Sequence, residues 1–136
     1  MSEAVRKNRQ KFGVMRFADV MHYRLPLAGY VSIFHRVSGA LMFFLLPFIL
    51  YLLEQSLTSE ISFEYFKGFT SHWFAKLVIL ALAWSYLHHF CAGIRHLLMD
   101  VHMGLDKDSA RKSAVGVFAV SLPLTALVAL KLFGAF

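Results

Sequence analysis

The chain has 136 residues, of which 58% are hydrophobic and 16% are charged, and its formal net charge is +6. A short chain buries only about 60–70% of the surface that it exposes when unfolded, so one this apolar cannot hide its hydrophobic groups in water. The composition therefore excludes a soluble globule and predicts an integral membrane protein. The positive charge does not indicate nucleic-acid binding, because the sequence contains no nucleic-acid motif.

Residues 1–28 form a basic segment that we expect on the cytoplasmic side, where anionic lipid attracts lysine and arginine. Val14, Phe17, Val20 and Met21 indicate one side of a short interfacial helix ahead of Pro26. The first apolar run lacks a small-residue cleavage site, so we expect a mature, bacterial chain. The basic residues are Arg6, Lys7, Arg9, Lys11, Arg16 and Arg24.

Three continuous apolar stretches follow, at about 29–53, 73–99 and 115–133. Each is close to the ~20 residues that a helix needs to cross the bilayer, and none alternates as a barrel strand would. We therefore predict an all-α membrane protein with a three-helix transmembrane domain over residues 29–136. Residues 54–72 are expected to be a connector.

Lysine and arginine counts predict the orientation. The N-terminal segment and the loop at 100–112 are rich in them, whereas the 54–72 connector has only Lys67 and the C-terminal end only Lys131. The positive-inside rule then places the N-terminus inside and the C-terminus outside.

Ionisable residues within the spans are the candidate site, since they are costly in lipid. At ~1.5 Å per residue, Arg36 lies roughly 10 Å, His89 roughly 15 Å and His96 roughly 5 Å from the inner boundary. Ser32 and His35 fall in the same inner half of the bilayer as these three residues. We predict that all five form one site.

Helical spacing places His89, Gly93 and His96 on one side of the second span, with a gap at Gly93 that admits a flat group. Imidazole beside cationic side chains suggests haem, with a histidine as axial ligand and cations at the propionates. Ser32 and Arg36 are suitable donors to a quinone. His89 and His96 are about 10 Å apart along the helix, so they cannot both ligate one iron.

Plainer interpretations exist for each residue. His89 alternatively bonds a neighbouring helix, Arg36 extends to the interface, and Ser32 bonds the preceding turn. His35 and His96 are alternatively interfacial. We expect packing roles for His88 and for Cys91, the only cysteine, which excludes an internal disulfide and a cysteine-based cluster. Arg95 is expected to pair with Asp100 or lipid phosphate.

Two motifs resemble the cytochrome b subunit family of succinate dehydrogenase. Residues 32–39 (SIFHRVSG) resemble its S-I-x-H-R-x-[ST]-G motif, and residues 89–100 (HFCAGIRHLLMD) resemble its H-x-x-x-G-[LIV]-R-H-[LM]-x-x-D signature. Arg24-Leu25-Pro26-Leu27 resembles the family's step into the first span. The family's N-terminal Arg-Pro step reads Arg9-Gln10 here, which leaves the docking of the N-terminal segment open.

The resemblance implies an oxidoreductase subunit of the tricarboxylic acid cycle and respiratory chain, in a multi-pass protein of the bacterial inner membrane. It implies haem b shared with a second small membrane subunit, which supplies the other axial ligand, and ubiquinone as electron acceptor. FAD and iron–sulfur clusters belong to a flavoprotein subunit and an iron–sulfur subunit, where succinate is oxidised. No catalytic residue is expected in this chain.

Carried over by position, His89 matches the haem iron ligand. His35, His96 and Arg36 match residues near the haem propionates, and Ser32 and Arg36 match ubiquinone-site residues. The alternatives are a fumarate reductase membrane subunit, which shares this membrane chemistry, and a haem-free transport or assembly subunit.

Overall fold

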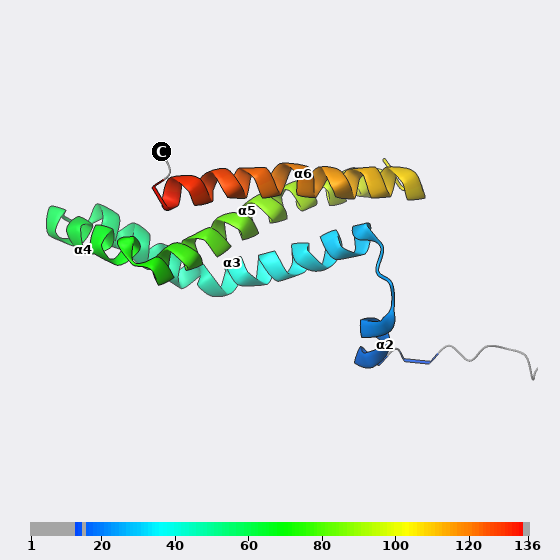
Figure 1. Cartoon of the computed structure of the whole chain (residues 1–136), viewed down its shortest axis with the longest axis horizontal. Coiled ribbons are helices and arrows are strands. Elements are labelled where there is room, and N and C mark those ends of the chain that lie inside the picture. The colour runs from blue at the N-terminus through cyan, green and yellow to red at the C-terminus, as the bar shows by residue number, and fades with distance from the viewer. Residues whose placement is uncertain (1–12, 15, 135–136) are drawn as a thin grey trace, which may run out of the picture.

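The computed structural model describes residues 13–14 and 16–134. The regular structure within those residues is helical: α2 (Phe17–His22), α3 (Leu27–Leu57), α4 (Glu60–Ser71), α5 (Trp73–Asp100) and α6 (Lys107–Leu132). Helices α3, α5 and α6 run side by side, and α4 lies at the end of the bundle where α3 ends and α5 begins (Figure 1). All three bundle helices are long and apolar enough to cross a membrane.

The prediction of three long apolar helices is confirmed, with different bounds at several ends. α3 and α6 begin before the apolar runs do, and both continue through an internal proline, Pro47 in α3 and Pro123 in α6. A proline removes one helical hydrogen bond, which neighbouring helices and side chains compensate within membrane proteins. The division between a basic segment over 1–28 and a transmembrane domain over 29–136 stays a prediction.

A helix is present at Phe17–His22, where the sequence indicated one. It lies apart from the bundle, at the end where α3 begins (Figure 1). Its placement in a membrane interface and the inside orientation of the N-terminus stay predictions. The basic residues Arg6, Lys7, Arg9 and Lys11 lie outside the described residues.

The bundle has a core of small side chains. Val31 of α3, Ala92 of α5 and Ala114 and Val117 of α6 form a buried apolar cluster. Small residues let membrane helices approach closely and gain van der Waals contacts. Large aromatic and aliphatic side chains point outward instead, such as Phe43 at 72% and Phe44 at 77% exposure. Lipid or a partner subunit, rather than water, must cover these exposed apolar side chains.

Asp106 caps the N-terminus of α6. One of its carboxylate oxygens accepts a hydrogen bond from the backbone N–H of Ser109 at 2.9 Å, and this bond lowers the carboxyl pKa below its ordinary value of 3.8. A lowered folded-state pKa stabilises the helix above the ordinary pKa, and the stabilisation is lost as the pH falls through the lowered value. We expect Asp106→Asn to retain the cap while removing this acid-dependent contribution. Melting curves of the two complexes should differ in their pH dependence only at acidic pH.

The end of α5 holds one strained residue. The N–H of Met103 donates to the Leu98 carbonyl at 2.9 Å and the N–H of His102 donates to the Met99 carbonyl at 3.0 Å, which is a Schellman motif. His102 therefore takes a φ of 63°, a conformation that favours glycine. We expect His102→Gly to stabilise the complex by up to about 1 kcal/mol, because relief of a left-handed cost of roughly 1–2 kcal/mol exceeds the roughly 0.5–1 kcal/mol of extra backbone entropy that glycine loses on folding. A melting temperature unchanged or lowered relative to wild type would contradict this.

Candidate haem and quinone site

Three imidazoles meet where α3 packs against α5. The ring of His35 stacks on that of His89, with centroids 4.0 Å apart and planes 16° apart. The His35 ring also lies 5.0 Å from the ring of His96. Residues more than fifty positions apart in sequence are thus brought together, as their expected depth in the membrane predicted.

The orientation of His89 is set by the backbone of α3. Its Nδ1 lies 3.0 Å from the carbonyl oxygen of His35. Because a carbonyl only accepts, Nδ1 must carry the proton, and a neutral imidazole then presents an unprotonated Nε2. Fixing one ring nitrogen in this way is how proteins orient histidines that ligate metals.

Ser38 completes this contact. Its hydroxyl donates to the same His35 carbonyl at 2.9 Å and lies 3.4 Å from Nδ1 of His89. Ser38 is fully buried. Ser38 stands in the first motif, but no role for it was predicted from the sequence. Only the packing of α3 on α5 reveals that it faces His89.

Two glycines make room for the imidazoles. A Cβ atom added at Gly39 would come within 3.0 Å of Cε1 of His89, so a larger residue would displace that ring. A Cβ atom at Gly93 would lie 3.6 Å from Nε2 of His35. This is an ordinary van der Waals distance, so the imidazole of His35 lies directly against Gly93, and the gap for a flat group at this position stays a prediction.

Ser32 and Arg36 lie on α3, one turn apart and flanking His35 in the sequence. Ser32 is partly buried and Arg36 is exposed. Among the described residues, neither side chain has a hydrogen bond or an ion pair, so the bond from Ser32 to the preceding turn is not formed. An uncovered guanidinium at this depth would be costly in lipid, which leaves a partner subunit, a ligand or the membrane interface to solvate it.

His88 is adjacent to His89 but faces elsewhere. It is fully buried among Phe34, Trp84 and Phe118, whose ring centroids lie 5.4–5.9 Å from its own. Neither imidazole nitrogen reaches hydrogen-bond geometry, although one faces the Val31 carbonyl. The expected packing role of His88 is confirmed.

Arg95 differs from its expected pairing. Its Nε donates to the hydroxyl of Ser113 on α6 at 3.0 Å, and the residue is only 5% exposed. The prediction of a pair with Asp100 was wrong because Arg95 faces α6, whereas sequence neighbours alone suggested a local partner. Arg95 holds α5 to α6 rather than facing the three imidazoles.

The residues of this site could provide one axial ligand to a haem iron. His89 offers a single, oriented imidazole with its Nε2 unprotonated, and a porphyrin supplies four further nitrogens by itself. Among the described residues there is no group of three or more side chains able to hold a bare metal ion. The three imidazoles therefore suit a haem better than a metal ion held by protein ligands alone.

Comparison with known proteins gives concordant matches. Residues 10–128 match the family described as succinate dehydrogenase/fumarate reductase transmembrane subunit. A succinate dehydrogenase cytochrome b556 subunit from Paracoccus denitrificans is 31% identical over 111 residues, covering 82% of this chain and 85% of that protein. The subunit of the same name from Coxiella burnetii is 35% identical over 105 residues, covering 76% of this chain and 83% of that protein. One from Rickettsia felis is 27% identical over 106 residues, covering 78% and 82%.

Proposed function

Because the chain belongs to the family of succinate dehydrogenase and fumarate reductase transmembrane subunits, we propose that it binds haem b and passes electrons from succinate oxidation to ubiquinone. The chain is a multi-pass membrane protein and a subunit of an oxidoreductase complex. The observation that carries the proposal is the orientation of His89, whose Nδ1 is engaged by the His35 carbonyl so that Nε2 is left for a metal. The relatives are named for cytochrome b556, which agrees with this proposal.

His89 would hold the iron, and a haem b bound there would supply one-electron storage between the iron–sulfur clusters and the quinone. His35 and His96 lie beside His89 and, together with Arg36, would pair with the propionates. Ser38 and the His35 carbonyl keep the ring of His89 in the required tautomer. The second axial ligand would come from a second small membrane subunit.

Ser32 and Arg36 would bind ubiquinone. A hydroxyl and a guanidinium are donors to the quinone carbonyl oxygens, and a donor that also carries charge stabilises the developing negative charge on reduction. Their position one turn apart on α3, with Arg36 exposed from this chain, supports a site completed by a partner subunit. In this proposal Arg36 would lie within reach of both the quinone and the haem propionates.

We further propose the bacterial inner membrane as the location, with the basic N-terminal end in the cytoplasm. There the chain would anchor an iron–sulfur subunit and a flavoprotein subunit carrying FAD. Succinate oxidation is favoured over fumarate reduction as the physiological direction because the relatives named above are all succinate dehydrogenase subunits. A fumarate reductase working in the reverse direction is the second candidate, since the family description includes it.

A complex isolated through an affinity tag on this chain tests the proposal. We expect a reduced-minus-oxidised spectrum of b-type haem and succinate-dependent reduction of ubiquinone. Comparing rates with succinate and quinone against rates with quinol and fumarate distinguishes the two directions. A colourless complex without a flavoprotein would instead support a haem-free transport or assembly subunit.

A further inference from the structure

Helix α4 was not expected from the sequence, which was interpreted as a connector over residues 54–72. Only Thr58 and Ser59 separate it from α3, and only His72 separates it from α5. Ser59 and Ser62 form a capping box: the Ser59 hydroxyl accepts from the N–H of Ser62 at 3.1 Å, and the Ser62 hydroxyl accepts from the N–H of Ser59 at 2.9 Å. Two membrane-crossing helices thus hold a well-capped helix at one end of the bundle (Figure 1).

The helix lies at a membrane boundary. The 31 residues of α3 extend over roughly 46 Å at ~1.5 Å per residue, which exceeds a hydrocarbon core of ~30 Å. Because a carboxylate is costly in lipid, the charged Glu54 in the last turns of α3 indicates that this end reaches the head-group region. α4 packs beside those turns through Phe69, whose ring centroid lies 6.1 Å from that of Phe48. Tyr51, Leu52 and Gln55 of α3 line a small cavity together with α4.

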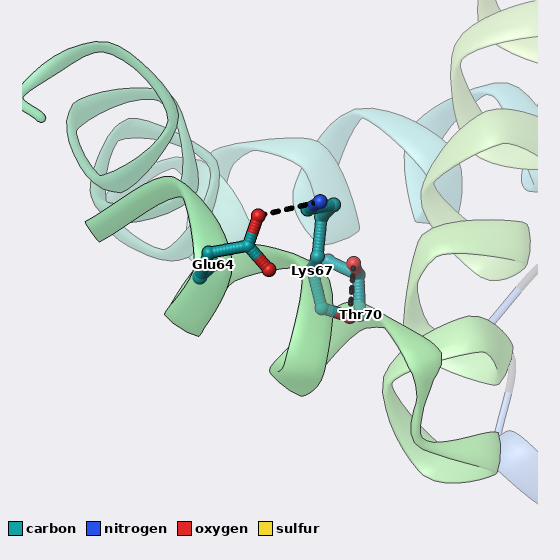
Figure 2. A network of polar contacts seen from close by, with 3 residues as sticks. All are labelled: Glu64, Lys67 and Thr70. Carbon is teal, nitrogen blue, oxygen red and sulfur yellow. Dashed lines mark hydrogen bonds and ion pairs between the residues drawn. The ribbon is translucent and has the colours of Figure 1, made fainter. Parts of the chain in front are cut away.

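One side of α4 is polar. Glu64 and Lys67 form an ion pair with a nitrogen–oxygen distance of 2.6 Å, and both side chains are largely exposed (Figure 2). Thr70 does not add a free hydroxyl, because its Oγ1 donates to the Phe66 carbonyl at 2.8 Å and lies 3.3 Å from the Lys67 carbonyl. This side suits water and lipid head groups.

A second side of α4 is apolar and partly exposed, although Phe69 at its end also contacts α3. Ile61, Tyr65 and Phe69 follow one another at four-residue intervals and are 73%, 73% and 46% exposed. With Glu64 and His72 they line a shallow groove of about 580 Å³ over Gly68, where an added Cβ would meet nothing within 4 Å. Trp73 and Phe74, just beyond α4, are also largely exposed. Aromatic side chains of this kind concentrate at membrane interfaces.

We propose that this apolar side of α4, defined by Ile61, Tyr65, Gly68 and Phe69, is a lipid-binding surface whose groove takes a phospholipid acyl chain from the leaflet at that end of the bundle. The proposal rests on the position of α4 at the end of the bundle, on its exposed apolar side chains, and on a groove whose lining is mostly apolar. Interfacial amphipathic helices bind lipid in this way. It is independent of haem and quinone binding.

Photo-crosslinking of the intact complex in phosphatidylethanolamine and phosphatidylglycerol vesicles tests it. p-Benzoylphenylalanine replaces Tyr65 in one variant and Ile61 in a second, so that either position reports if the other impairs assembly. The matched control places the same residue at Lys67, whose loss breaks a surface ion pair and a cation–π contact with Phe63 on the same helix. Mass spectrometry then identifies what each position captures.

We expect phospholipid adducts at Tyr65 and Ile61 at several times the yield at Lys67. Adducts to another polypeptide at Tyr65 and Ile61 would overturn the proposal, because a partner subunit would then cover the surface. Equal lipid yields at all three positions, or none, would also overturn it, because the surface would then face water or contact lipid without preference.

Discussion

Replacing His89 by leucine is expected to remove the b-type absorption from the isolated complex. Leucine keeps an apolar side chain at the α3–α5 contact but has no nitrogen to bind iron, and the His35 carbonyl loses its imidazole donor. The measurement is the reduced-minus-oxidised spectrum, normalised to flavin content so that partial assembly does not mimic haem loss. Succinate oxidation by artificial dyes, which needs no membrane site, should persist in complexes that assemble.

His88→Phe is the matched control. His88 is adjacent to His89, but its ring is buried among Phe34, Trp84 and Phe118, where phenylalanine preserves the aromatic packing. Since its nitrogens lack hydrogen-bond partners among the described residues, removing them leaves no new unpaired group. We expect a normal haem spectrum. If His89→Leu retains haem, or if only His88→Phe loses it, His89 is not the iron ligand.

Arg36→Gln is expected to slow succinate-dependent quinone reduction while leaving succinate–dye activity unchanged. Removing a hydrogen bond to a charged group costs about 1.5–3 kcal/mol, which corresponds to roughly 10- to 150-fold in kcat/KM for the quinone. Ser32→Ala removes a neutral donor worth about 0.5–1.5 kcal/mol and should cost roughly 2- to 12-fold. Steady-state kinetics with a soluble ubiquinone analogue measure both variants.

Arg111→Gln serves as the control for charge. Arg111 is exposed near the start of α6 and lies outside the group of Ser32, His35 and His89, so its loss should leave quinone kinetics unchanged. If Arg36→Gln also reduces quinone like wild type, Arg36 does not bind the quinone. If Arg36→Gln lowers haem content as well as quinone turnover, the arginine serves the propionates and the quinone together.

The contact between α3 and α5 positions both the proposed iron ligand and the proposed quinone-binding residues. The His35 carbonyl of α3 orients His89 of α5, while Ser32 and Arg36 project from the adjacent turns of α3. A shift of α3 along α5 is therefore expected to disturb the proposed haem and quinone sites together. Gly39 sets how closely the two helices approach at this level, because an added Cβ there would meet Cε1 of His89 at 3.0 Å.

The sequence by itself determined that three helices cross the membrane, since each apolar run has no other way to satisfy its backbone in lipid. It also determined which residues share a helix side and a half of the bilayer: periodicity places His89, Gly93 and His96 together, and helix rise places His35 in the same inner half. The motifs around Ser32 and His89 then indicated the family that the comparisons support.

Only the tertiary structure showed which side chains of different helices contact one another, because these contacts depend on the rotation of each helix about its axis. Helix α4 was not predicted because charged residues interrupt its apolar ones and no apolar run is long enough to cross the membrane, although Ser59 and Ser62 carry a capping signal. The partner of Arg95, the role of Ser38 and the separate facings of His88 and His89 depend on rotation about the helix axes. Periodicity fixes a residue's neighbours on its own helix, but only packing decides which helix stands opposite them.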